Sequence, residues 1–301
     1  MRFGLVGTGP WAELAHAPGL AAAEGIELVG IWGRSPGRAR ALADSYGVAA
    51  YDDYAALLAD VEAVAFAVPP AVQGELALAA AVAGRHLLLD KPVAADPGAA
   101  RALLAAATEA GVASVVFFTD RFVGETRAWI EDVRRTPGWH GGWVRWFSAL
   151  QEPDNPFGAS PWRHEAGALW DTGPHALSTL IATLGPIASL TAVGGRGDEV
   201  CLVASHASGA TSTIALTQFA PPAASQYEAT VWGEAGFSAM PPRPEGAFGA
   251  LLATAAEELV ACASSGQPHE LDLRFGVEVV ELLAQAQQQL DGTASPVGSP
   301  R

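Results

Sequence analysis

Lys91 is the only lysine in the chain, and its position indicates that it takes part in chemistry. The sequence contains 17 lysine and arginine residues, and every one except Lys91 is an arginine. Arginine keeps its proton near neutral pH, whereas burial can lower the pKa of a lysine from about 10.4. Lys91 follows the apolar run 86–89, and ligands of open α/β sheets bind beyond the carboxyl ends of the strands. We therefore expect Lys91 to face a ligand, with chance survival of one lysine at a strand end as the alternative.

Asp171 and His175 lie four residues apart around a predicted helix start, with Pro174 near the first helical position. This spacing lets both side chains project toward one point. A carboxylate beside an imidazole fixes its tautomer and raises its basicity, which gives an acid/base group near neutral pH. The alternative is an aspartate stabilised by the helix dipole and a surface histidine whose hydrogen bonds are satisfied.

Gly7, Gly9 and Ala12 form the pattern G-x-G-x-x-A directly after an apolar strand and at the start of a helix. In this setting the first glycine permits a tight turn, and the second lets the backbone approach a pyrophosphate at the helix N-terminus. The pattern predicts a dinucleotide-binding loop. A glycine-rich turn without a ligand is the alternative.

The end of the second predicted strand distinguishes the two nicotinamide cofactors. NAD sites usually place an aspartate or glutamate there for the adenosine ribose, but this chain has Gly33, Arg34 and Ser35, with Arg38 one turn later. Guanidinium and hydroxyl groups without a carboxylate would accept a 2′-phosphate. We expect NADP(H) to be preferred over NAD(H), unless the two arginines are ordinary surface charges.

Alternating strands and helices must position these residues in the first part of the chain. Apolar strands separated by helices indicate a parallel sheet that is covered on both faces. We predict an α/β fold with a doubly wound Rossmann domain over residues 1–121. Its strands are expected at 2–6, 27–31, 63–68, 86–89 and 113–118.

The remainder, residues 122–301, has a different pattern. Long stretches rich in Thr, Val, Trp and Ile show partial alternation of apolar and polar residues. Glycine turns separate them, as in an antiparallel sheet with one covered face. We predict a C-terminal α+β domain with a large, mostly antiparallel sheet for substrate binding and oligomerisation. Two helices are expected to follow, over 248–263 and 275–290.

Composition limits the classes of partner. The formal charge of −15 over 301 residues disfavours nucleic acid and anionic membrane surfaces. Cys201 and Cys262 have neither metal-type spacing nor a disulfide framework, which fits a reducing cytoplasm. No apolar run approaches the ~20 residues of a membrane span. We expect a cytoplasmic protein that acts on a small molecule.

Taken together, the glycine pattern of Gly7, Gly9 and Ala12 (the fingerprint), the Asp90-Lys91-Pro92 motif and the segment 167–175 resemble the Gfo/Idh/MocA oxidoreductase family, which includes glucose–fructose oxidoreductase and inositol dehydrogenase. The resemblance covers nearly the whole chain. It implies that Lys91, Asp171 and His175 are the catalytic set.

The same resemblance, with the arginine and serine after the second strand, implies a cofactor site spread over several loops and a Trp-Arg pair near the nicotinamide. The expected cofactor-binding residues are Gly7, Thr8, Gly9, Pro10, Trp11, Arg34, Ser35, Arg38, Pro69, Pro70, Asp90, Lys91, Pro92, Trp162 and Arg163. The expected substrate contacts are Lys91, Arg121, His164, Asp171 and His175.

Three departures from the family pattern are visible. Asp90 replaces the usual glutamate, and Gly167 is the one glycine kept from a run of three, so the backbone before Asp171 could run differently. Gln73 stands where many members have histidine. None of these changes touches the lysine, the aspartate or the histidine of the expected catalytic set.

The resulting hypothesis is hydride transfer between a nicotinamide and a hydroxyl or carbonyl carbon of a sugar, cyclitol or similar polyol. Two other classes stay open. One is a metal-dependent enzyme that uses His164, Asp171 and His175 as ligands, although no metal is expected in the preferred reading. The other is a non-catalytic NADP-binding sensor that binds a partner.

The open face of the second sheet, with Trp143 and Trp232, is the expected association surface. We expect a homodimer or homotetramer formed through this C-terminal sheet.

Overall fold

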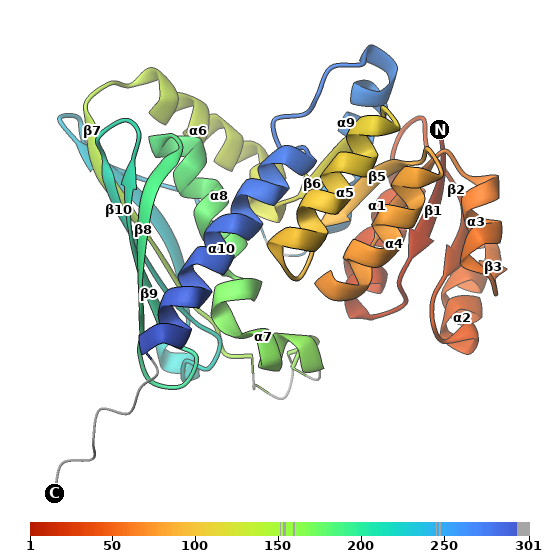
Figure 1. Ribbon diagram of the computed structural model, residues 1–301, viewed down its shortest axis with the longest axis horizontal. Helices are drawn as coiled ribbons and strands as arrows, with labels where there is room; N and C mark the ends of the chain where they lie inside the picture. The colour runs from red at the N-terminus through yellow and green to blue at the C-terminus, as the bar shows by residue number, and fades with distance from the viewer. Residues whose placement is uncertain (151, 153–154, 159, 245, 247, 294–301) are drawn as a thin grey trace, which may run out of the picture. The chain divides into compact units, whose positions relative to one another are not determined.

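The computed structural model describes residues 1–150, 152, 155–158, 160–244, 246 and 248–293 (Figure 1). Contacts divide the chain into a first unit of residues 1–123 and 243–280 and a second unit of 124–242 and 281–301. The sequence had predicted two continuous domains, 1–121 and 122–301. The observed units differ because the chain returns to the first unit after residue 242. Residues 294–301 of the predicted second domain lie outside the described residues.

The first unit is built on six parallel strands in the order β3-β2-β1-β4-β5-β6. This order confirms the predicted Rossmann sheet. The central strands are buried along nearly their whole length because helices cover both faces. The strands are β1 (Arg2–Val6), β2 (Glu27–Trp32), β3 (Ala49–Tyr51), β4 (Ala63–Phe66), β5 (His86–Asp90) and β6 (Ser114–Phe117).

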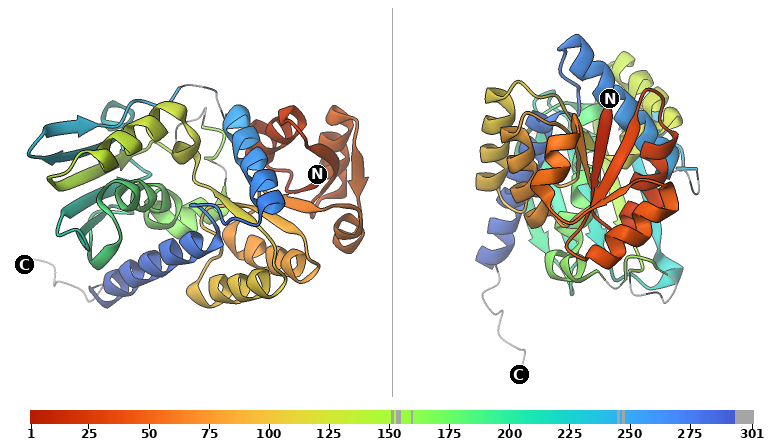
Figure 2. Two further views of the ribbon diagram at one scale, coloured as in Figure 1. Left: turned by 90° about the horizontal axis from the view of Figure 1, so that it is seen from above. Right: turned by 90° about the vertical axis from the view of Figure 1, so that its right-hand side faces the viewer.

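Helix starts in this unit follow from local sequence. For example, Asp96 accepts a hydrogen bond from the backbone N–H of Ala99 at 2.9 Å, and Pro97 occupies the first helical position of α5. Helix α4 packs beside α5 and α1 beside α9, on opposite faces of the sheet (Figure 2). The helices are η1 (Ala12–His16), α1 (Ala17–Ala22), α2 (Pro36–Tyr46), α3 (Tyr54–Asp60), α4 (Pro70–Val82), α5 (Pro97–Glu109), η2 (Thr119–Phe122), α9 (Phe248–Ser265) and the first part of α10 (Leu273–Thr293).

Helix α9 explains why a late segment belongs to the first unit. Leu252 and Leu259 are fully buried, and a side chain at Gly19 of α1 would collide with Leu252, its Cβ lying 2.8 Å from that of the leucine. By length and composition alone, α9 is the one helix in the described part of the chain that could cross a membrane. The sequence had been expected to contain no such segment. A core helix has the same apolar composition, so composition assigns α9 to neither role.

The second unit contains six strands in the order β12-β11-β7-β10-β9-β8. All neighbours are antiparallel except β7 and β10, which run parallel. The predicted large, mostly antiparallel sheet is therefore confirmed. The strands are β7 (Trp139–Phe147), β8 (Ile187–Gly194), β9 (Val200–His206), β10 (Thr211–Thr217), β11 (Gln226–Gly233) and β12 (Gly236–Ala239).

One face of this sheet is buried and the other is open. Along β9 every second residue is buried, and Leu202 pairs with the equally buried Ile214 of β10. The alternate residue Val203 is exposed and pairs with Thr213. The elements that accompany the sheet are α6 (Gly124–Arg135), α7 (Pro161–Asp171), α8 (Gly173–Leu184), η3 (Pro222–Ala224) and the last part of α10.

Candidate functional site

The predicted cofactor residues of the first unit follow neighbouring strands of one parallel sheet. The fingerprint follows β1, Arg34 and Ser35 follow β2, and Lys91 follows β5. Because all six strands run in the same direction, these residues lie at the same carboxyl edge. Pro69 and Pro70 join them after β4, where Pro70 begins α4.

The fingerprint turn is tight at Gly7 and open at Gly9. Gly7 has a φ of +130°, and a Cβ there would lie 2.4 Å from the carbonyl oxygen of Ala67. A Cβ on Gly9 would meet no heavy atom within 4 Å. Gly33 lets Thr8 approach closely, since a Cβ on Gly33 would lie 2.8 Å from the Thr8 methyl group. A closed turn with space above its second glycine fits the approach of a dinucleotide pyrophosphate.

The residues after this turn form a continuous helix that contains a π-helical segment, η1. π-Helical turns are rare and occur frequently at functional sites. Trp11 stacks on Phe117 with ring centroids 6.2 Å apart and meets the edge of Phe248 at 5.0 Å. His16 is fully buried, and its ring packs edge-on against Trp11 and Phe117. These aromatic contacts anchor the helix that follows the fingerprint.

The segment after β2, which is predicted to distinguish NADP(H) from NAD(H), carries two arginines and a serine. Arg34, Ser35 and Arg38 are all exposed. Ser35 is the N-cap residue of α2, but its side chain makes no capping hydrogen bond. A hydroxyl and two guanidinium groups are therefore exposed just beyond the carboxyl end of β2.

Lys91 is half-buried in the turn that follows β5. Its backbone N–H donates to Oδ1 of Asp90 at 2.8 Å, and the peptide bond from Lys91 to Pro92 is cis. The amide side chain of Gln73, from α4, hydrogen bonds to the backbone on both sides of the lysine. The sequence had marked Gln73 only as a departure from the family pattern.

Arg121 lies in η2, the short helix that forms the loop after β6, and is 3% exposed. Its guanidinium is 3.0 Å from a carboxylate oxygen of Glu270. The neighbouring Asp120, equally buried, pairs with Arg243 at 3.1 Å. These ion pairs hold the loop to the segment that returns from the second unit. A substrate contact for Arg121 stays a prediction.

In the second unit, Asp171 ends α7 and His175 lies in the first turn of α8. Both are buried, at 4% and 7% exposure. Gly167 interrupts α7 with a φ of +67°, a conformation that favours glycine. The residues before Asp171 therefore form a helix that is kinked at Gly167, the one glycine kept from the family's run of three.

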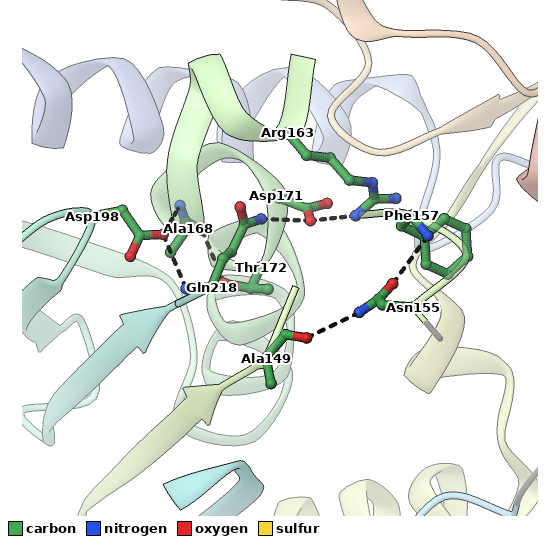
Figure 3. A network of polar contacts seen from close by, with 9 residues as sticks. All are labelled: Ala149, Asn155, Phe157, Arg163, Ala168, Asp171, Thr172, Asp198 and Gln218. Atoms are coloured by element: carbon green, nitrogen blue, oxygen red, sulfur yellow. Dashed lines mark hydrogen bonds and ion pairs between the residues drawn. The ribbon is translucent and has the colours of Figure 1, made fainter. Parts of the chain in front are cut away.

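A polar network fixes Asp171 (Figure 3). Oδ2 of Asp171 accepts hydrogen bonds from Arg163 and, at 2.6 Å, from the side-chain amide of Gln218. Asp198 in turn accepts from the backbone N–H of Gln218 at 2.9 Å and from that of Ala168, next to the kink, at 3.2 Å. Sequence reasoning missed Gln218 and Asp198. The glycine turns predicted between the strands of this unit were the only related signal.

One aromatic ring lies beside each of the two predicted histidines, His164 and His175. The His175 ring lies 5.2 Å from that of Trp146. His164 is exposed, stacks on Phe219 at 5.8 Å and has Nε2 2.6 Å from the carbonyl oxygen of Gly158. The guanidinium of Arg163 lies over the Trp162 ring at 5.0 Å, so this predicted pair is in contact.

The metal alternative finds no support in this geometry. Within the described residues, no three His, Cys, Asp or Glu side chains are grouped so that they could hold an ion. The Asp171 carboxylate is engaged by Arg163 and Gln218.

The parallel sheet, the glycine turn and the second unit with its mixed sheet define a two-unit dinucleotide-binding protein. Residues 1–118 match the model described as "Oxidoreductase family, NAD-binding Rossmann fold", and residues 141–238 match the GFO/IDH/MocA C-terminal domain. The chain belongs to the GFO/IDH/MocA oxidoreductase family, which confirms the resemblance inferred from the sequence.

Similar proteins include enzymes named for sugar substrates. The chain is 29% identical over 190 residues to dTDP-3,4-didehydro-2,6-dideoxy-alpha-D-glucose 3-reductase of Streptomyces antibioticus, covering 62% of this chain and 57% of the relative. It is 35% identical over 125 residues to D-xylose 1-dehydrogenase (NADP(+)) 2 of Haloferax volcanii, covering 40% and 38%. The chain thus matches well under two thirds of the length of these relatives.

A solved structure has the same fold over the whole chain. The WlbA dehydrogenase from Bordetella pertussis, in complex with NADH and UDP-GlcNAcA, has a TM-score of 0.83 at 22% identity. The alignment covers 97% of this chain and 96% of that one.

The buried His16 predicts a pH dependence of stability. Burial lowers the pKa of His16 from 6.5 to about 4. Between these values the unfolded chain binds a proton that the folded protein does not, so stability falls as the pH falls from 6.5 toward 4. The loss attributable to His16 between pH 7 and pH 5 is about 2 kcal/mol.

Urea unfolding at pH 7 and pH 5 measures this loss. His16→Leu should reduce the difference between the two free energies of unfolding by about that amount. His140→Leu, at an exposed histidine, is the control and should behave as the wild type. An unaltered pH dependence in His16→Leu would contradict the burial of a neutral imidazole.

Proposed function

We propose that the protein is an oxidoreductase that prefers NADP(H) and acts on a hydroxyl or carbonyl carbon of a sugar, cyclitol or similar polyol. The observation that carries this proposal is the carboxyl edge of the first sheet, where the open fingerprint and the single lysine occur together. The bound nicotinamide would supply or accept a hydride. Family membership and the sugar substrates in the names of two relatives support the substrate class.

The roles of the side chains follow from their chemistry and from the family resemblance. His175 takes or donates the hydroxyl proton. Lys91 hydrogen bonds to the reacting oxygen and stabilises its developing negative charge. Asp171 holds a substrate hydroxyl or orients the imidazole, and its charge is balanced by Arg163. The non-catalytic sensor is the second candidate, and it predicts cofactor binding without turnover on any substrate.

Lys91→Met tests the catalytic role directly. The variant should fold and bind NADPH as the wild type does, while kcat falls about 100-fold to 10,000-fold because a proton donor and charge stabiliser are lost. Turnover is measured with whichever sugar or polyol the wild type oxidises in a panel. Arg40→Met, at an exposed position of α2, is the control. Near-wild-type turnover in Lys91→Met would sink the proposed role.

Cofactor preference is tested by titrating NADPH and NADH. The wild type should bind NADPH more tightly, because Arg34 and Ser35 offer charge-assisted hydrogen bonds to a 2′-phosphate. Arg34→Asp should weaken NADPH binding about tenfold or more and leave NADH binding little changed. Arg40→Asp, at an exposed position of α2, separates this effect from net charge. Equal or tighter binding of NADH by the wild type would show that Arg34 and Ser35 do not favour NADP(H).

We also propose that the open face of the second sheet joins two copies of the chain. The strand register places exposed apolar residues on this one face: Val193 and Val203, with 59% and 52% exposure, and Trp232 beside Phe237, with 41% and 75%. Together with the threonines between them, these side chains form a mixed surface of the kind found at subunit interfaces.

Light scattering measures the expected association. The wild type should have the mass of a dimer or tetramer, and Phe237→Asp should lower it, because burying a carboxylate without a partner is costly. Val82→Asp, at an equally exposed apolar residue of the first unit (72%), is the control. A monomeric wild type at micromolar concentrations and above would refute the interface.

A further inference from the structure

We propose that Gln73 is a positioning residue that fixes the backbone from which the Lys91 side chain extends. The importance of this for catalysis rests on the proposed function. Gln73 lies at the end of the first turn of α4 and is 1% exposed. The residues around Lys91 form an irregular turn rather than a helix or strand. Backbone groups in such a turn need partners from outside, and Gln73 supplies them.

The side-chain amide of Gln73 spans the lysine turn. Nε2 lies 2.7 Å from the carbonyl oxygen of Asp90, 3.2 Å from that of Pro92 and 3.2 Å from that of Val93. Oε1 accepts from the backbone N–H of Asp90 at 2.9 Å. One side chain therefore holds the backbone immediately before Lys91 and the two residues after it.

An amide is suited to this position by its donors and acceptors. The –NH₂ group offers two hydrogens to three converging carbonyl groups, and the carbonyl offers an acceptor to one N–H. A glutamate could accept but would turn a second oxygen toward three carbonyl oxygens. A neutral histidine has one donor and one acceptor, so it can replace part of the pattern.

The sequence of α4 fixes where this amide lies. Pro69 and Pro70 set the start of the helix, and the N–H of Gln73 donates to the carbonyl oxygen of Pro69 at 2.9 Å. Gly74 then allows close approach of the lysine loop, since a Cβ at Gly74 would lie 3.3 Å from the Cβ of Ala94. The helix start that follows β4 thereby controls the position of the turn that follows β5.

The loop also packs against α10 within the first unit. Val93 is fully buried, and a Cβ on Gly276 of α10 would lie 2.6 Å from one of its methyl groups. Val93 thus packs where glycine leaves room. With the hydrogen bonds from Gln73 and the packing of Val93 against Gly276, Lys91 lies in a turn whose backbone has little freedom to relax.

Because Lys91 is the only lysine, its amine can be followed without any substrate. Trace labelling with acetic anhydride across a pH series, read by mass spectrometry of the Lys91 peptide, gives the reactivity of this one side-chain amine in the folded protein. The variants are Gln73→Leu, which removes all four hydrogen bonds, and Gln73→His, which keeps a donor and an acceptor.

A matched control is available in the second unit. Gln289 of α10 makes the same kind of bridge, accepting from the N–H of Ala192 at 2.9 Å and donating to the carbonyl oxygen of Leu190 at 2.9 Å. Gln289→Leu removes a comparable bridge far along the chain from Lys91. It should change stability without changing the labelling of Lys91.

The expected result is a rise in the Lys91 labelling rate of about threefold or more in Gln73→Leu, as the freed turn exposes the amine. In Gln73→His the rate should return to within about twofold of the wild type. Wild-type labelling in Gln73→Leu, or the same rise in Gln289→Leu, would overturn the proposal. If Gln73→Leu does not fold, Gln73→Ala leaves room for water in place of the amide and is measured in the same way.

Turnover separates this inference from the proposed function. Combined with Lys91→Met, Gln73→Leu should cause no further loss of kcat, because a residue that acts through Lys91 has nothing left to position. An additional loss in that background would show that Gln73 acts by another route. If Lys91→Met keeps full turnover while Gln73→Leu still alters labelling, the positioning holds and the catalytic role of Lys91 fails.

Discussion

The parallel order of the first sheet is the constraint on which the rest of the cofactor edge depends. It brings the carboxyl ends of β1, β2, β4 and β5 to one side, so that four loops far apart in sequence share an edge. Each loop can then be specialised separately. The first leaves space above Gly9, the second carries Arg34 and Ser35, and the fourth presents Lys91. The sheet supplies the common frame, and the chemistry comes from residues just beyond it.

In the second unit, the cost of burying Asp171 shapes the local structure. A buried carboxylate is tolerated when charged and hydrogen-bonding partners surround it. Arg163 balances the charge, and Gln218 adds a donor at 2.6 Å. Asp198 fixes the backbone of Gln218 and reaches the residue that follows the kink. The kink at Gly167 lets the helix that ends in Asp171 take part in this network.

Much of the frame could be predicted from sequence because it depends on local patterns. The apolar strands, the fingerprint turn and the helix start around Pro174 each lie within a few neighbouring residues. The remaining features depend on pairing over long distances. Gln218 reaches Asp171, and Asp198 reaches the backbone of Gln218, only after β9 and β10 have paired. The packing of α9 on α1 likewise joins residues more than 200 positions apart, which is why the predicted boundary did not separate the observed units.

Two buried amides, Gln73 in the first unit and Gln218 in the second, have the same role as hydrogen-bond donors to oxygen atoms. Each places a donor against oxygen atoms, carbonyl groups in one case and a carboxylate in the other. An amide can hold these groups without titrating, whereas a histidine or carboxylate would add a proton-binding group of its own. A neutral side chain therefore holds the backbone around Lys91, and at Asp171 a neutral amide acts beside the charged Arg163. A histidine at position 73 would hold the lysine turn with fewer bonds and would bring a titrating group next to its backbone.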